Sequence, residues 1–151
     1  MSFTHPTGTH GARQPGRSTR FFNKLIARRA RRADGKTMGM SLLVLTTVGR
    51  KSGQARENPV GYFAAPDGGW FIAASAAGAQ ANPAWYLNLA AHPDQVTVEL
   101  AGRKVAVTAR ELHGTEREQV WTQITNEAPG FRKYEQTTDR EIPVIHLTPK
   151  D

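Results

Sequence analysis

The chain has 151 residues, no cysteine and a net charge of +7. This length suits one domain with a real hydrophobic core, and the lack of cysteine excludes disulfides and thiolate chemistry and indicates a reducing cytoplasm. No apolar run approaches the roughly 20 residues that cross a bilayer, so we predict neither a signal peptide nor a membrane span.

The positive charge is concentrated at the N-terminus. Residues 1–40 contain nine Lys or Arg residues and one acidic residue, whereas residues 41–151 contain eleven and twelve. The body of the protein is therefore nearly neutral, which argues against a nucleic-acid-binding surface. The N-terminal charge indicates instead that this segment alone makes an electrostatic interaction.

The basic segment divides into a tail and a helix. Residues 1–18 have almost nothing to bury and are predicted to form a disordered basic tail. Residues 19–33 are predicted to form an amphipathic helix with an apolar stripe and an Arg-rich opposite face. The pattern fits two functions equally: a helix that packs over one end of the domain, or an interfacial helix that binds an anionic membrane surface.

Residues 41–59 form the most informative stretch. An apolar strand over Ser41–Thr47 leads into a loop in which Gly49 and Gly53 flank two cations and a hydroxyl, and Arg56 lies on the returning strand. Converging donors on one short turn favour a bound phosphate, although a solvated hairpin with a basic turn has the same spacing. The loop is not a Walker A motif, because no helix is predicted after it.

Further strands are predicted over residues 57–65 and 70–75, joined antiparallel by a turn at 66–69. The small residues 73–78 fit either a flat ligand against the backbone or tight barrel packing. Asn82 and Pro83 are predicted to cap and begin a helix that ends at His92, with Trp85 and Asn88 on one face.

The C-terminal half completes an antiparallel sheet. Strands are predicted over residues 95–100, 103–112 and 142–147, and a capping box at Thr115 predicts a helix over 115–128. Residues 131–138 form either a short helix or a lid. The fold class is therefore α+β, a small split β-barrel or roll with six or seven mostly antiparallel strands and helices at the N-terminus and between strands.

Two common kinds of active site have no support in the sequence. His92, His113 and His146 lack the spacing of metal ligands, so we predict no metal site. No Gly-x-Ser-x-Gly elbow of a hydrolase is present. A phosphate-holding loop, an Ala-rich strand and an aromatic helix fit a bound cofactor that supplies its own reactivity.

The chain resembles the deazaflavin-dependent nitroreductase family of actinobacteria, whose members use coenzyme F420. The resemblance covers about residues 41–149. It is carried by five spaced motifs: TTVGRKSG at 46–53, RxNP at 56–59, AAS at 73–75, NPxWYxNL at 82–89, and TDR at 138–140 before Ile142 and Pro143. It implies a split β-barrel, with residues 19–151 forming a single cofactor-binding domain.

The resemblance also implies which residues bind the cofactor. The phosphate and the acidic tail of F420 are expected at Arg50, Lys51, Ser52 and Arg56, with Glu57, Asn58, Pro59 and Val60 adjoining them. The deazaflavin ring is expected between Ala73, Ala74, Ser75 and Ala76 on one side and Ala84, Trp85, Tyr86, Leu87 and Asn88 on the other. Many family members have a lysine at the position of Ala76, so the affinity for F420 is expected to be lower here.

The expected reaction is hydride transfer from the reduced deazaflavin to a quinone, an enone or a nitroaromatic acceptor. Tyr134 is the one tyrosine in the segment that is Tyr-rich in the prodrug-activating member, and it is expected to donate a proton or to line the substrate pocket. An FMN-dependent oxidoreductase and a non-catalytic deazaflavin carrier are the alternatives. Related barrels dimerise, so a homodimer is expected by analogy.

Overall fold

The computed structural model describes residues 3–11, 36–37, 40–75, 78 and 81–150. Most of the predicted tail, the predicted helix at 19–33 and Ala76 lie outside these residues. The helices that are described are too short or too polar to span a membrane.

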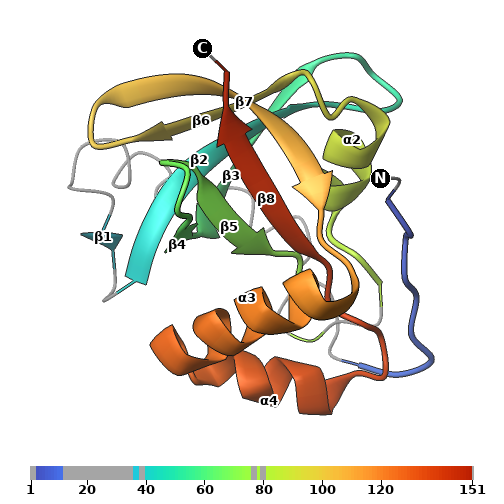
Figure 1. Cartoon of the computed structure of the whole chain (residues 1–151). Coiled ribbons are helices and arrows are strands. Elements are labelled where there is room, and N and C mark those ends of the chain that lie inside the picture. Colours follow the sequence, from blue (N-terminus) through green and yellow to red (C-terminus); the bar gives the residue numbers. More distant parts are fainter. Residues whose placement is uncertain (1–2, 12–35, 38–39, 76–77, 79–80, 151) are drawn as a thin grey trace.

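Eight strands and three helices make up the described part of the chain (Figure 1). The strands are β1 (Lys36–Thr37), β2 (Met40–Val48), β3 (Ala55–Gly61), β4 (Phe63–Ala64), β5 (Trp70–Ala73), β6 (Val96–Leu100), β7 (Arg103–Glu111) and β8 (Val144–Pro149). The helices are α2 (Ala84–Ala91), α3 (Gly114–Glu127) and α4 (Gly130–Thr137).

The strands form one curled antiparallel sheet. Its order is β1-β2-β6-β7-β8-β5-β4, and β3 pairs with the other side of β2. Strand β3, which pairs with β2, and strand β4, at the far end of the path, are consecutive in the chain and are separated only by Tyr62, so the sheet curls back on itself. The predicted α+β split barrel is confirmed, with short β1 and β4 strands in addition to the six that the sequence indicates.

The expected single strand over residues 57–65 is wrong in detail. The chain forms β3 and β4 instead: the bond from the N–H of Tyr62 to the carbonyl of Ser41 is the last contact with β2, and β4 then pairs with β5. Pro59 is tolerated within β3 because that strand pairs only with β2 among the described strands and its other edge needs no donor.

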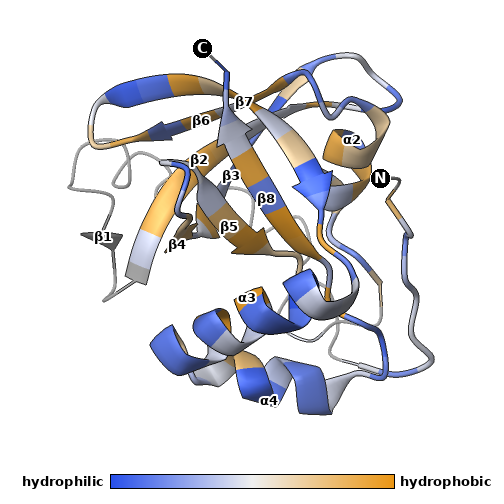
Figure 2. Ribbon diagram, in the orientation of Figure 1, coloured by the Kyte–Doolittle hydropathy of each residue, from blue (hydrophilic) through white to orange (hydrophobic). Residues whose placement is uncertain are grey.

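Two hydrophobic clusters stabilise the barrel. The first fills its interior with aliphatic side chains such as Leu43, Ile72 and Val98, each with no exposed surface. The second lies between β5, β8 and the helices α3 and α4, and contains Trp121, Ile124 and Phe131. Figure 2 shows hydrophilic residues on much of the outer surface of both helices, as expected for amphipathic helices on a sheet.

Helix α3 begins differently from the prediction. His113 is the N-cap and no side chain caps the helix, so the capping box expected at Thr115 does not form. Glu118, the expected return partner of that box, is ion-paired with Arg117 at 2.8 Å. Residues 130–137 form the helix α4 rather than an irregular lid.

The first described residues are bound to the barrel, which corrects the prediction of a disordered tail for residues 3–11. Figure 1 shows this segment running from the side of α2 toward the end of α4. The ring of Phe3 packs edge-on against Tyr86 at 5.8 Å, and the N–H of Thr9 donates to Asp139 at 2.7 Å. Composition alone missed these contacts because most of them are made by backbone groups, which every sequence has.

Candidate cofactor site

The basic loop between β2 and β3 is a tight hairpin turn with its own hydrogen bonds. The N–H of Gly49 donates to Gln54 O and the N–H of Gly53 to Gly49 O, both at 2.8 Å. Gly53 has a φ of 72°, and a Cβ at Gly49 would lie 2.5 Å from Ser52 Oγ. Gly53 therefore suits the left-handed backbone of the turn, and the absence of a side chain at Gly49 leaves room for the Ser52 hydroxyl.

The loop presents three exposed cations: Arg50, Lys51 and Arg56. Among the described residues, no carboxylate lies within ion-pairing distance of any of them. Arg56 Nη2 donates to Ser52 Oγ at 3.5 Å, which keeps the hydroxyl beside the guanidinium. Two cations on the turn and one at the start of β3, with no carboxylate partner in the described structure, form a suitable site for an anionic ligand.

Helix α2 fixes the base of this loop through Asn88. Its Oδ1 accepts a hydrogen bond from the backbone N–H of Arg50 at 3.1 Å, and its Nδ2 donates to Thr47 Oγ1 at 3.4 Å. The side chain of Asn88 is 5% exposed. Asn88, predicted to face the ring, therefore contacts the backbone of the basic loop and connects α2 with that loop.

The start of α2 also differs from the prediction. Pro83 is the N-cap with no side-chain cap, and the helix begins at Ala84. Asn82, the expected cap, donates from Nδ2 to Pro6 O at 2.7 Å and accepts at Oδ1 from Arg140 at 2.6 Å. A tertiary contact to a buried guanidinium has replaced the local capping bond.

Arg140 joins the start of α2 to the end of β5. Its Nη1 donates to Ala74 O at 3.0 Å and its Nη2 to Ser75 O at 2.8 Å, in addition to the bond to Asn82. The residue is 2% exposed, and this burial lowers the pKa of the guanidinium. In the sequence, Arg140 belongs to the TDR motif at 138–140, and no function is predicted for it.

The residues predicted to flank the ring differ in exposure. Ala73, Ala74 and Ser75 are buried at the end of β5. Ala84 is exposed, and Trp85 and Leu87 are partly exposed and pack against the inner core. The outward side chains of α2 and the carbonyl-bonded end of β5 are thus the two sides of the candidate site.

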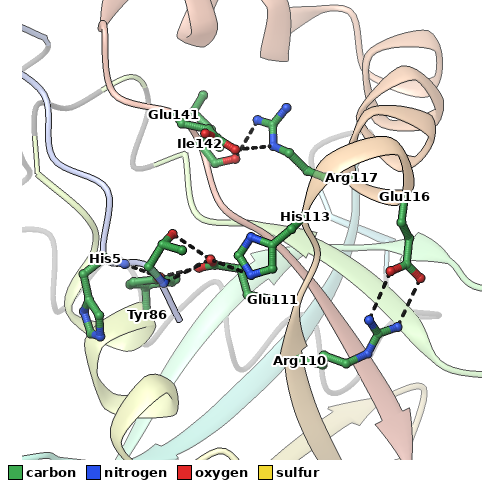
Figure 3. Close-up of polar contacts among 10 residues, drawn as sticks. His5, Tyr86, Arg110, Glu111, His113, Glu116, Arg117, Glu141 and Ile142 are labelled. Atoms are coloured by element: carbon green, nitrogen blue, oxygen red, sulfur yellow. Dashed lines mark hydrogen bonds and ion pairs between the residues drawn. The ribbon is translucent and has the colours of Figure 1, made fainter. Parts of the chain in front are cut away.

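Tyr86 is a core residue in this structure. It has no exposed surface, and its phenol donates to the carboxylate of Glu111, which is itself 2% exposed (Figure 3). Burial and then the bond to Glu111 raise the pKa of the Tyr86 phenol. The same carboxylate accepts from Thr4 and lies 3.4 Å from His113 Nε2. The role of Tyr86 visible here is therefore to hold α2 on β7.

Tyr134 lies on α4 beside the segment that follows β5. Its ring is 5.4 Å from that of Phe131. Gly78 has a φ of 80°, and a Cβ there would lie 3.2 Å from Tyr134 O, so the backbone passes close to α4. The remaining predicted residues are on β3: Glu57 is exposed, Asn58 and Pro59 are partly exposed, and Val60 is buried.

Comparison with known proteins gives the family. A family model described as F420H(2)-dependent quinone reductase matches residues 19–149. This chain belongs to the F420H(2)-dependent quinone reductase family. The resemblance expected from the spaced motifs is confirmed, and the family is that of the quinone reductases.

Individual relatives agree with this assignment. An F420H(2)-dependent quinone reductase of Mycobacterium tuberculosis is 38% identical over 111 residues, which are 70% of this chain and 72% of the relative. The solved structure of an F420-H2 dependent reductase (FDR-A) is 36% identical, with a TM-score of 0.63 over 70% of this chain and 92% of that one. A structure titled as a domain-swapped dimer is 32% identical, with a TM-score of 0.64 over 86% and 98%.

Proposed function

We propose that this member of the quinone reductase family binds coenzyme F420 at the β2–β3 loop and catalyses hydride transfer from F420H2 to a quinone. The observation that carries the proposal is the set of exposed cations on the loop, which has no carboxylate partner in the described structure and is fixed by Asn88. A phosphate and an acidic tail fit such a donor set, because each anionic oxygen gains charge-assisted hydrogen bonds.

The two sides of the site bind different parts of the cofactor. Arg50, Lys51, Ser52 and Arg56 bind the phosphate and the acidic tail, with Glu57, Asn58, Pro59 and Val60 forming the adjoining strand. The ring side consists of Ala73, Ala74 and Ser75 opposite the outward residues of α2, Ala84, Trp85 and Leu87, while Tyr86 and Asn88 hold that helix in place.

When bound, the reduced deazaflavin supplies a hydride. The protein contributes orientation, because a hydride moves only between atoms held in near contact. Tyr134 lines the acceptor side from α4 and donates the proton that follows the hydride, or positions the water that does. The preferred hydride acceptor is a quinone. Enones and nitroaromatic compounds are further acceptors.

The proposal is tested by cofactor binding and by turnover. Fluorescence titration with F420 and, in parallel, with FMN identifies the cofactor. Anaerobic oxidation of F420H2 is then followed with a water-soluble quinone, an enone and a nitroaromatic compound. Tight binding of FMN in place of F420 identifies the flavin alternative, and binding of F420H2 without oxidation by any acceptor identifies a carrier.

The basic N-terminal segment supports a second proposal, that this enzyme is cytoplasmic and associates with the inner membrane surface. Residues 19–33 carry the basic helix predicted from the sequence, and anionic lipid attracts each basic group by about 1 kcal/mol. Neutralising Arg28, Arg29, Arg31 and Arg32 together is expected to abolish sedimentation with anionic vesicles at low salt. If the intact protein stays in the supernatant under these conditions, the membrane proposal is wrong.

We further propose that the protein forms a homodimer in solution. A relative of 32% identity whose structure is titled as a domain-swapped dimer covers most of this chain and supports the proposal. Light scattering on the purified protein measures its mass directly, and a value near 16.6 kDa at all concentrations would contradict a dimer.

A further inference from the structure

We infer that Arg140 is a positioning residue that holds the two ring-facing sides of the cofactor site at a fixed separation. The inference rests on the proposed function, because it assigns Arg140 to the same site. The guanidinium of Arg140 donates to Ala74 O, Ser75 O and Asn82 Oδ1, so its effect on the site passes through the backbone and through Asn82.

Three described acceptors of the guanidinium belong to two separate segments. Ala74 O and Ser75 O directly follow strand β5, whereas Asn82 Oδ1 precedes α2. Arg140 lies between 58 and 66 residues away from them in sequence. One side chain therefore fixes where β5 stops and where α2 starts.

A guanidinium is required for this arrangement. Its planar fork directs Nη1 and Nη2 to acceptors on different segments at once, whereas a lysine ammonium donates from a single point on a flexible stem. At 2% exposure, water does not replace a lost donor, so each carbonyl left without its bond is destabilised.

Arg140 is itself held rigidly. Its N–H donates to Thr138 Oγ1 at 3.1 Å, and that hydroxyl donates to His10 O at 2.6 Å. The N–H of Ala74 donates to Pro143 O at 2.9 Å, which ties β5 to the segment that follows Arg140. The N-terminal residues thus contact both Asn82, through Pro6, and the backbone around Arg140.

The two parts of the site are therefore expected to respond differently to a change of Arg140. The cations that bind the anionic part of F420 lie on the β2–β3 loop, which Asn88 holds, so they remain in place when Arg140 is changed. In contrast, the end of β5 and the start of α2 lose their fixed separation in an Arg140 variant. Arg140→Lys is therefore expected to lower turnover at saturating cofactor roughly 10- to 100-fold, because misplacement of reacting groups is costly, and to change the F420 dissociation constant much less.

Arg117 provides a matched control. It is also buried, at 5% exposure, and its Nη2 donates to a carbonyl, that of Ile142, at 2.8 Å (Figure 3). Within the described part of the chain, its guanidinium contacts Glu118, Glu141, Ile142 and Trp121, which belong to neither side of the site. Arg117→Lys is expected to lower stability and to leave turnover per folded molecule unchanged.

The experiment compares both variants with the wild type by amide hydrogen exchange without cofactor, and by turnover and binding with F420. In Arg140→Lys, the amides of residues 73–75 and 84–88 are expected to exchange roughly 10- to 100-fold faster, the equivalent of one charged hydrogen bond. In Arg117→Lys these two segments are expected to exchange as in the wild type.

Unchanged exchange in both segments of a folded Arg140→Lys protein would overturn the inference, as would equal loss of turnover in the two variants. If Arg140→Lys does not fold, Asn82→Ser is used: it removes one acceptor and leaves both carbonyl bonds, and faster exchange confined to residues 84–88 is expected. If the wild type does not bind F420, the proposed function is wrong, and the exchange measurement alone decides whether Arg140 joins the two segments.

Discussion

Asn88 Oδ1 accepts a hydrogen bond of 3.1 Å from the backbone N–H of Arg50, 38 residues earlier in the chain. Through this bond, helix α2, on the proposed ring side, holds the conformation of the basic loop that is proposed to bind the phosphate. A direct hydrogen bond therefore joins the two parts of the proposed site.

Asn88→Ala is expected to weaken F420 binding, because the N–H of Arg50 loses its acceptor and the loop loses its anchor. The loss of a buried partner corresponds to about 1–3 kcal/mol. Fluorescence titration measures the dissociation constant. The matched control is Asn126→Ala, an exposed asparagine on α3 that accepts from Arg132 at 3.2 Å, and it is expected to bind F420 normally. Equal affinities of both variants would contradict the role of Asn88.

Arg50→Ala and Lys51→Ala are expected to weaken F420 binding far more than they slow turnover at saturating cofactor. Each removes a charge-assisted contact to an anionic group, on the order of 1.5–3 kcal/mol. Lys104→Ala, which removes an exposed cation from the β6–β7 hairpin, controls for net charge. Unchanged dissociation constants in both loop variants would remove the phosphate-loop hypothesis.

Trp85 is expected to report on the cofactor. It is partly exposed on α2, whereas Trp70 and Trp121 are 8% and 6% exposed in the two cores. A change in tryptophan emission on adding F420 should disappear in Trp85→Phe and persist in Trp121→Phe. Persistence of the full response without Trp85 would place the ring elsewhere.

Tyr86→Phe is expected to destabilise the protein by about 1–3 kcal/mol, because the buried carboxylate of Glu111 loses the phenol that donates to it. Urea unfolding monitored by circular dichroism measures this difference. Tyr134→Phe, at a partly exposed tyrosine of α4, serves as the comparison. A difference below a few tenths of a kcal/mol between the two variants would show that the phenol contributes little.

The contact between Asp139 and the N-terminal segment is expected to depend on pH. Hydrogen bonds from the side chain and the backbone of Thr9 lower the pKa of Asp139 from 3.8 to about 2. A carboxylate with a lowered pKa contributes stability that is present above 3.8 and is lost as the pH falls toward 2. The contribution of this exposed group is screened by salt.

The measurement is the free energy of unfolding of the wild type minus that of Asp139→Asn, as a function of pH. This difference is expected to be constant near neutrality and to shrink below pH 3.8. A difference that grows on acidification would assign the opposite sign to the contact.

Local patterns in the sequence determined most of the elements of this protein. The alternation of residues 103–112 and the apolar run after Ser41 correspond to β7 and β2, and the glycines at 49 and 53 marked the basic turn. These features depend on neighbours along the chain, and side-chain period and turn chemistry are local properties. The spaced motifs also identified the F420-dependent family correctly.

Tertiary structure alone decided what Asn82, Asn88 and Arg140 contact. Asn82 has the sequence pattern of a helix cap, yet its amide accepts from Arg140, because a buried guanidinium needs acceptors that only the folded chain assembles. Likewise, Tyr86 and Trp85 are adjacent in sequence, and only the packing of α2 on β7 made one a core residue and left the other partly exposed. Contacts across 38 to 66 residues leave no local pattern, since they depend on where the sheet curls rather than on neighbouring residues.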